Sequence, residues 1–315
     1  MDRQPAVIAV IAARNGRRWI AAALESLAAS TVPVRAVVVD NASSDGTADA
    51  AEKLPFVECL RLSENTGFGA ATNRGIRRAL EHGADYVLLL NQDARISPDM
   101  LAEMLRCCSG APDVGIMSPL HLNYEADAVE PAFLSFVSGS CRLVSDALTG
   151  AVRELYEVPF CHAAVWLLSR ALLERIGGFD PVFFMYGEDH DYCSRARFHG
   201  FKIGIAPKAV ACHWHGGGDM LEKRPFQEQS LRLAGQIICR LKRPDHRFSP
   251  SLLGIMGTWA QRLLIATACG DFRQAVALAA AWLRVLPQLA RIRRHHVLCR
   301  QPGMLWLGRQ ERACS

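Results

Sequence analysis

Short apolar runs of strand length alternate with helical segments in the N-terminal part of the chain, and this alternation constrains the fold most. The runs span 6–13, 34–39, 57–62 and 85–90, and helical spacing fills 17–29, 48–54 and 68–82. Strands that are apolar on both faces and separated by helices are typical of a parallel sheet covered on both sides. We therefore expect an α/β fold with a Rossmann-like, doubly wound, mostly parallel sheet.

Polar side chains follow each of these strands directly. Ligands of such sheets bind outside the carboxyl ends of the strands, so we expect a pocket there. Asp45-Gly46 is an ordinary turn, whereas Asp40 and Asp93 close apolar strands and are better candidates for binding. The candidate residues at the strand ends are Arg14, Asn15, Asp40, Asn41, Asn65, Asn91, Gln92 and Asp93.

Two features of this pocket predict its ligand. Segment 65–75 opens a helix with small residues, which lets backbone N–H groups approach a phosphate or a sugar. It lacks the glycine spacing of the dinucleotide fingerprint and follows the third strand, so an NAD enzyme is disfavoured. Asp93 stands where one carboxylate and a diphosphate could share a divalent cation, an arrangement that Mg²⁺ prefers.

Three carboxylates crowd segment 183–191, which lies between glycines and aromatic residues. They are Glu188, Asp189 and Asp191. Like charges this close repel unless something compensates them, which favours a catalytic role for the segment. The following residues predict a short helix that stops at Gly200, with Asp189 as its N-cap. Helix capping and the helix dipole alone would also explain these acids, and that alternative stays open.

The middle of the chain predicts strands at 133–144, 159–168, 202–205 and 209–212. The last strand leads into His213-Trp214-His215. Alternate residues of a strand point to opposite faces, so only one of His213 and His215 can join a given site. A structural histidine beside a tryptophan is the competing interpretation.

The chain changes character after about residue 220, which predicts two regions. We expect a catalytic domain over 1–220, with two halves at about 1–110 and 111–220, and a helical C-terminal region over 221–315. The apolar runs 252–269 and 275–286 are too short and interrupted to span a bilayer. They are either amphipathic helices at a membrane interface or a helical pair packed on the catalytic domain.

The charge of the chain limits its possible partners, and its cysteine content limits its possible cellular compartment. The net charge is +5, and basic residues crowd the C-terminal end, a pattern that suits an anionic membrane surface. The chain carries no nucleic-acid-binding motif, so we expect no nucleic acid partner. Eleven cysteines without a Cys-x-x-Cys pair indicate a reducing compartment. We expect a cytoplasmic protein without a signal peptide, with the inner face of the plasma membrane as a peripheral location.

The motifs together resemble the family 2 inverting glycosyltransferases, in the rhamnosyltransferase-like branch that builds bacterial cell-surface polysaccharides. The resemblance covers roughly 7–218 and rests on segments 40–47, 65–75, 90–93, 177–180, 183–191 and 213–216. It implies a GT-A fold, a nucleotide-sugar donor, and Mg²⁺ or Mn²⁺ as cofactor. It also implies that the half at about 1–110 binds the nucleotide sugar and that the half at about 111–220 binds the acceptor. Gln92 stands where the family often has proline or an acid, and His162-Ala163-Ala164 replaces a usual Gly-Ala pair.

The resemblance also implies roles for single residues. Asp40 matches the acid that contacts the nucleotide base, and Asp189 matches the general base. Asp93 matches the last acid of the metal-binding triplet, and His213 or His215 matches the histidine that helps to hold the metal or the diphosphate. The residues that line the donor side are Asn65, Gly67 and Asn73.

The predicted function is therefore the transfer of a single sugar, rhamnose or another hexose, from a nucleotide diphosphate sugar to a saccharide or lipid-linked acceptor. A processive synthase is disfavoured, because Gln229-x-x-Arg232 is followed by Leu233 and not by tryptophan. Two alternatives remain: a sugar-phosphate nucleotidyltransferase, although the lysine expected after the first strand is absent, and a non-catalytic polysaccharide-binding homologue.

Overall fold

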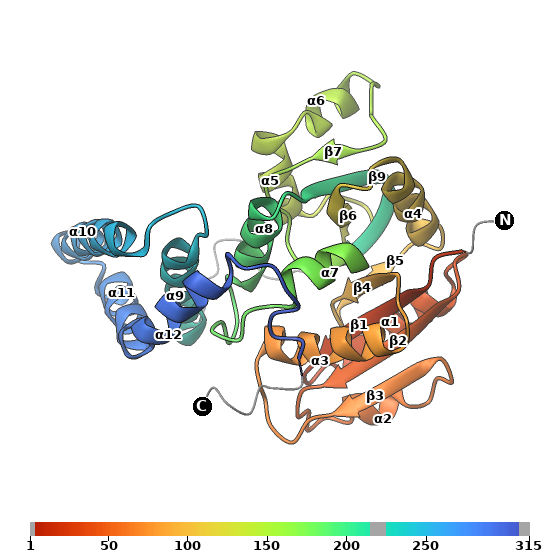
Figure 1. The fold of residues 1–315 in the computed structure, drawn as a ribbon, viewed down its shortest axis with the longest axis horizontal. Coiled ribbons are helices and arrows are strands. Elements are labelled where there is room, and N and C mark those ends of the chain that lie inside the picture. Colours follow the sequence, from red (N-terminus) through yellow and green to blue (C-terminus); the bar gives the residue numbers. More distant parts are fainter. Residues whose placement is uncertain (1–3, 215–224, 309–315) are drawn as a thin grey trace.

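A single mixed sheet forms the centre of the larger, N-terminal region of the chain (Figure 1). The computed structural model describes residues 4–214 and 225–308. The order of the strands is β3-β2-β1-β4-β8-β6-β9-β5, with β7 paired to β9. Their bounds are β1 Val7–Ala13, β2 Val34–Asp40, β3 Val57–Arg61, β4 Tyr86–Leu90, β5 Ala94–Ile96, β6 Val114–Asn123, β7 Tyr156–Glu157, β8 Val165–Ser169 and β9 Lys202–His213.

The four predicted N-terminal strands are confirmed, and β1 to β4 pair in parallel. β8 is antiparallel to both β4 and β6, so the sheet is mostly parallel but mixed. Helices cover both faces of this sheet, as the apolar character of its strands predicts. The helices of this region are α1 Arg17–Ala28, α2 Thr47–Ala51, α3 Phe68–Glu81, α4 Met100–Gly110, α5 Pro131–Ser140, α6 Leu143–Leu148, α7 Arg170–Ile176 and α8 Glu188–Phe198.

Two hydrophobic cores lie on the opposite faces of the sheet. One joins the strands to α1 and α4 through residues such as Leu24 and Met104. The other joins the strands to α3, α7 and α8 through residues such as Ile76 and Tyr192. This arrangement leaves the carboxyl ends of β1, β2 and β4 at one edge of the layered domain, where a ligand can reach them.

The middle of the chain differs from the sequence prediction. Segment 133–144, predicted as a strand, belongs to helices α5 and α6. The physical reason is that Phe133 and Val137 are both buried and stand four residues apart, so they share one helix face. Of the predicted strand at 159–168, only 165–168 is extended, as part of β8. The two predicted strands at 202–205 and 209–212 form one strand, β9.

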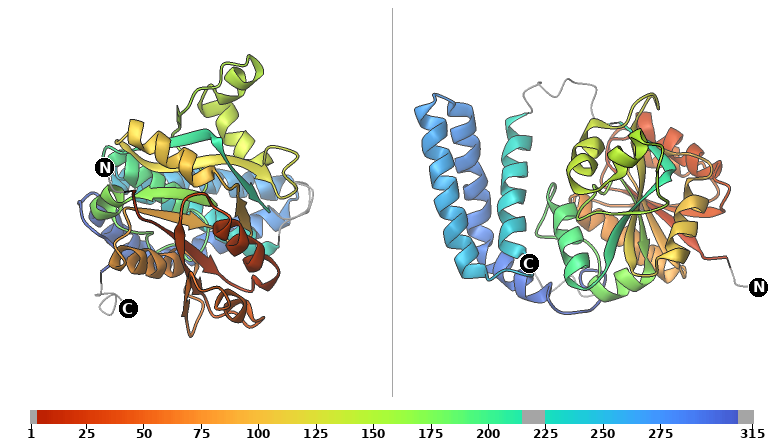
Figure 2. Two further views of the ribbon diagram at one scale, coloured as in Figure 1. Left: turned by 90° about the vertical axis from the view of Figure 1, so that its right-hand side faces the viewer. Right: turned by 90° about the horizontal axis from the view of Figure 1, so that it is seen from above.

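The C-terminal region is helical and has a core of its own. Its elements are α9 Phe226–Lys242, α10 Phe248–Ala268, α11 Phe272–Val285, the 3₁₀ turn η1 Leu286–Gln288 and α12 Leu289–Leu298. Seen from above, α9, α10 and α11 run side by side, and α9 lies nearest to α8 of the N-terminal region (Figure 2). Val182 and Phe183, which precede α8, pack into the core of these helices.

One helical stretch is longer than the apolar run 275–286 that the sequence analysis considered. Phe272–Leu298, which runs through α11, η1 and α12, is long and apolar enough to cross a membrane by length and composition, with a mean hydropathy of 1.3 over its most apolar window. A core helix of a soluble protein passes the same test, and 33% of that window is buried inside the protein.

Candidate active site

The predicted donor residues meet where β1, β2 and β4 end. The Arg14 backbone N–H donates to Gln92 Oε1 at 2.9 Å, and the Arg14 side chain donates to the carbonyl of Asn41 at 2.8 Å. Asn15, with a positive φ of 46°, accepts from the Ser44 N–H through its side-chain oxygen. These bonds tie three strand ends into one polar surface.

A second group of bonds shapes the turn before α3. The Asn41 amide donates to Asn65 Oδ1 at 2.9 Å and accepts from the Thr66 N–H at 2.9 Å. Gly67 has a φ of 85°, and a Cβ there would lie 2.3 Å from the carbonyl oxygen of Phe184. Glycine therefore lets the segment that carries the predicted base approach the donor side.

Asp40 has the clearest sign of a missing partner. Its Oδ2 accepts from the Ser43 N–H at 3.2 Å, whereas its buried Oδ1 has no hydrogen-bond partner among the described residues. A buried acceptor without a donor costs free energy unless a ligand supplies one. The geometry therefore fits the predicted contact between Asp40 and a nucleotide base.

The contacts of Asn73 differ from the predicted ones. It is buried, its Nδ2 donates to the carbonyl of Phe179 at 2.7 Å, and its Oδ1 accepts from the Phe179 N–H at 2.7 Å. Both side-chain atoms are thus used by the backbone of one residue. Asn73 fixes the turn before the acidic segment instead of lining the donor side.

Asp93 and His213 lie together, as predicted. Asp93 Oδ1 is 3.6 Å from His213 Nε2, and Asn91 Nδ2 is 3.4 Å from the same nitrogen. The other ring nitrogen of His213 donates to Glu130 Oε1 at 3.0 Å. Burial lowers the pKa of His213, but the hydrogen bonds and charges of Asp93 and Glu130 outweigh burial and bring the pKa to about 9. His215 lies outside the described residues.

Glu130 also joins this site to two more histidines that the sequence analysis did not predict as ligands. His121 Nδ1 lies 3.3 Å from Glu130 Oε2, and burial lowers the pKa of His121. One ligand atom each of His121, Glu130 and His162 lies within 4.8 Å of the others, close enough for a shared metal ion. The only sequence signal was His162, which stands where the family usually has a small residue. His121 lies on β6, and Glu130 reaches it only because the chain turns back after β6.

The acidic segment leads into α8, but not with Asp189 as N-cap. The N-cap is Gly187, in a left-handed conformation with a φ of 97°, and the helix begins at Glu188. Asp189 is half-buried, and its Oδ1 accepts from the His190 N–H at 2.8 Å, while the His190 ring stacks on Phe160 at 3.8 Å. Burial raises the pKa of Asp189. Its Oδ2 has no hydrogen-bond partner in the described part of the chain.

Glu188 and Asp191 differ sharply although both were predicted as catalytic. Burial and the neighbouring charge of Asp189 raise the pKa of Glu188 to about 8. Asp191 is buried between Arg195, whose Nε lies 2.9 Å from Oδ2, and Lys242, whose Nζ lies 2.7 Å from Oδ1. Both oxygens of Asp191 are thus neutralised by buried cations, which corrects its predicted role to a structural one.

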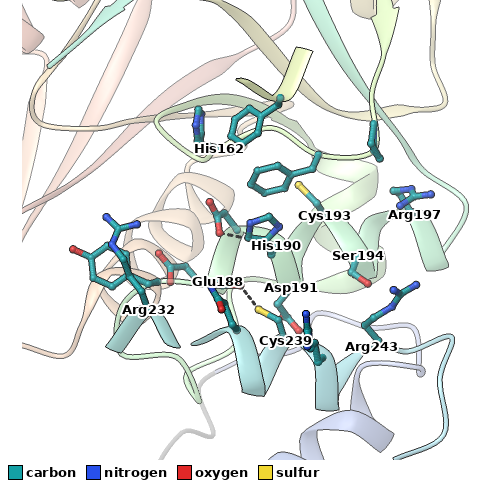
Figure 3. Close-up of a pocket in the computed structure, with 18 of the residues that line it drawn as sticks. His162, Glu188, His190, Asp191, Cys193, Ser194, Arg197, Arg232, Cys239 and Arg243 are labelled. Carbon is teal, nitrogen blue, oxygen red and sulfur yellow. Dashed lines mark hydrogen bonds between the residues drawn. The ribbon is translucent and has the colours of Figure 1, made fainter. Parts of the chain in front are cut away.

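A pocket of about 680 Å³ opens between α8, α9 and segment 159–162 (Figure 3). Asp189, Glu188 and His162 line it, and so do basic side chains of α8 and α9. Pockets of this size accommodate ligands as large as a nucleotide sugar or a disaccharide. His162 lies both in this pocket and in the cluster with Glu130, so it connects the predicted base to the surroundings of Asp93.

Comparison with known proteins decides the family. The profile described as glycosyl transferase family 2 matches residues 8–177. This chain belongs to that family. The N-acetylglucosaminyl-diphospho-decaprenol L-rhamnosyltransferase of Mycobacterium tuberculosis is 30% identical over 214 residues, which cover 60% of this chain and 70% of the relative. The low-salt glycan biosynthesis hexosyltransferase Agl10 of Haloferax volcanii is 31% identical over 180 residues, 56% of this chain and 58% of that protein.

A solved structure supports the fold of this family 2 glycosyltransferase along nearly the whole chain. The mannosyltransferase PcManGT from Pyrobaculum calidifontis, in complex with GDP-Man and Mn²⁺, superposes with a TM-score of 0.56 at 21% identity. The match covers 94% of this chain and 86% of that chain. The predicted GT-A fold and the rhamnosyltransferase-like family are therefore confirmed, and the enzyme class is glycosyltransferase.

Proposed function

We propose that this glycosyltransferase moves one sugar from a nucleotide diphosphate sugar to a saccharide or lipid-linked acceptor, with inversion and with Asp189 as general base. The observation that carries the proposal is the position of Asp189, whose Oδ2 is unpaired within the described chain in the wall of the 680 Å³ pocket. The M. tuberculosis relative, by its name, acts on a diphospho-decaprenol acceptor, which supports a lipid-linked acceptor here.

The chemistry is a single displacement. The acceptor hydroxyl oxygen forms a bond to the anomeric carbon, its proton passes to Asp189, and the bond from that carbon to the diphosphate oxygen breaks. A positioned base contributes about 10²–10⁴-fold to the rate. Because burial raises the pKa of Asp189, the carboxylate is a stronger base than an exposed aspartate. Inversion follows, since no covalent intermediate with the protein forms.

A divalent cation, Mg²⁺ or Mn²⁺, fits Asp93 and His213. A carboxylate oxygen and an imidazole nitrogen that lie 3.6 Å apart can approach one ion together. Glu130 holds the other nitrogen of His213, as carboxylates behind metal-bound histidines do. Such a cation would stabilise the negative charge of the departing diphosphate. Asp40, Asn41 and Arg14 would bind the nucleotide beside it.

The C-terminal helices suit a peripheral position on an anionic membrane. α10 and α11 expose large apolar side chains, among them Leu253, Leu264 and Leu283, each 72% exposed. Arginines such as Arg262 and Arg284 lie on the same helices. Apolar side chains that enter the interface and cations that meet lipid head groups are the two requirements for such binding. A membrane location would bring the catalytic pocket to a lipid-linked acceptor.

The Asp189→Asn variant tests the proposed function. We expect it to abolish sugar transfer but to keep the thermal stabilisation that a panel of nucleotide sugars gives in the presence of Mn²⁺. The control is Asp99→Asn, because Asp99 is exposed at the start of α4 and its side chain makes no capping hydrogen bond to that helix. Turnover retained by Asp189→Asn would reject the role of Asp189.

A further inference from the structure

One face of α9 carries a row of basic and polar side chains that the sugar-transfer chemistry does not use. They recur at intervals of four, four and three residues, which places them on the same side of the helix. All four line the pocket of the predicted base. They are Arg232, Gln236, Arg240 and Arg243.

α8 contributes a cation and a hydroxyl to the same pocket. Ser194 and Arg197 stand three residues apart, so they share one face of α8. In the close-up, Arg197, Ser194 and Arg243 gather on the side of the pocket away from Arg232 (Figure 3). The pocket therefore has a basic end, which is formed by Arg197 of α8 and by Arg240 and Arg243 at the end of α9.

Two of these arginines have no compensating charge. The side chains of Arg197 and Arg240 make no hydrogen bond or ion pair with any described residue. Arg243 pairs with Asp245 at 2.5 Å, and Arg232 pairs with Glu228 at 2.8 Å. Cations gathered at the end of a pocket create a positive potential that attracts an anionic ligand.

The acids of the pocket do not cancel this potential. Asp191 is already neutralised by Arg195 and Lys242. Glu188 holds its proton up to about pH 8, because burial and Asp189 raise its pKa. Among these three acids, only Asp189 carries a negative charge that no buried cation neutralises. One such charge does not offset the arginines, so the basic end keeps a net positive charge.

We propose that this basic end binds the diphosphate of a lipid-linked saccharide acceptor, with Arg197 and Arg240 as its principal contacts. The inference rests on the proposed function and specifies its acceptor. The planar guanidinium group of arginine binds phosphate oxygens with two parallel hydrogen bonds, which suits a diphosphate. The pocket volume of about 680 Å³ accommodates a sugar at Asp189 and a diphosphate beyond it.

The position of these arginines favours the acceptor over the donor. Arg14, Asp40 and Asn41, the predicted donor residues, come from the ends of β1 and β2 and do not line this pocket. The basic end instead lies on α8 and α9, and the last turn of α9 leads to the exposed apolar side chains of α10. A lipid attached to a diphosphate at Arg197 and Arg240 would thus continue along that apolar surface.

The test measures binding by the full-length protein, without sugar transfer. Arg197→Gln, Arg240→Gln and the double variant are titrated with farnesyl diphosphate, and with UDP, GDP and dTDP in the presence of Mn²⁺. The matched control is Arg35→Gln, because Arg35 is exposed at the opposite, amino end of the sheet. Charge-assisted hydrogen bonds imply about a tenfold weaker affinity for farnesyl diphosphate in each single variant and about a hundredfold in the double variant.

Affinity for the nucleotides should not change, and Arg35→Gln should bind like the unaltered protein. The proposal is overturned if the unaltered protein does not bind farnesyl diphosphate, if the double variant binds it equally well, or if nucleotide affinity falls to the same extent. Asp189→Asn should retain farnesyl diphosphate binding. An active Asp189→Asn variant would therefore reject the proposed base and leave this measurement of the arginines intact.

Discussion

The ammonium group of Lys242 lies 2.7 Å from Oδ1 of Asp191, and both residues are buried. Lys242 ends α9, and Asp191 stands two residues after the proposed base on α8. Lys242 also contacts Asp180, whose other oxygen lies 2.6 Å from His295 on α12. These ion pairs fix the C-terminal helices to the segment that positions Asp189, so the helical region supports the pocket structurally.

Removal of Lys242 should destabilise the protein strongly. Lys242→Met leaves Asp180 and Asp191 buried without their shared cation, and breaking such a pair costs about 3–5 kcal/mol. Urea unfolding, followed by the fluorescence of buried tryptophans, measures the loss. Lys208→Met is the control, because Lys208 is exposed and makes only a surface ion pair of 3.6 Å with Glu154. Equal stability of the two variants would contradict the structural role of this network.

Glu188 should make stability depend on pH. The folded protein holds its proton up to about pH 8, whereas an exposed glutamate releases its proton near 4.5. The folded state therefore binds more protons between these values, and the free energy of unfolding falls as the pH rises through this window. Glu188→Gln should reduce this fall and raise the free energy of unfolding at pH 8.5 by on the order of 1–3 kcal/mol. An unchanged pH profile would show that Glu188 ionises normally.

The N-terminal half of the fold could be predicted from the sequence because its strands are buried on both faces and end in polar residues. Segment 133–144 could not, because its apolar residues fit both a strand and the helix face that Phe133 and Val137 share. The structural role of Asp191 could not be predicted from the sequence either. Its partner Lys242 is 51 residues away, and no local pattern indicates that these two side chains meet.

One residue of the proposed metal site could not be predicted from the sequence either. Asp93 and His213 come directly after predicted strands, which made them candidates, whereas Glu130 stands in an acidic and polar segment that follows β6. β6 and β9 pair in parallel, and the bridge between Leu122 and Val129 turns the chain back toward His121. The buried position of Glu130 thus depends on long-range pairing that residue types alone do not reveal.

Glu130 should tune the proposed metal site without being essential for folding. Glu130→Gln keeps the shape of the side chain but loses the charge that orients His213, and loss of such a partner costs about 10–100-fold in metal affinity. Titration of Mn²⁺ in the presence of nucleotide measures this affinity. Asp93→Ala should remove the metal response together with transfer. Glu103→Gln is the control, because the Glu103 side chain lies on α4, is 32% exposed and pairs with Arg106. An identical Mn²⁺ affinity of the two glutamine variants would contradict the assignment.

The apolar surface of α10 and α11 should bind membranes that contain anionic lipid. Leu264→Gln and Leu283→Gln remove two side chains that are each 72% exposed, so folding loses little. Burial of one leucine in an apolar medium is worth about 1.5–3 kcal/mol, which predicts at least a tenfold weaker partition for each variant. Co-sedimentation with vesicles of phosphatidylglycerol and phosphatidylcholine measures this partition. Leu148→Gln on α6 is the matched control, since Leu148 is 85% exposed but lies on the catalytic region. If the three variants sediment alike, α10 and α11 do not contact the bilayer, and their exposed leucines must face another surface.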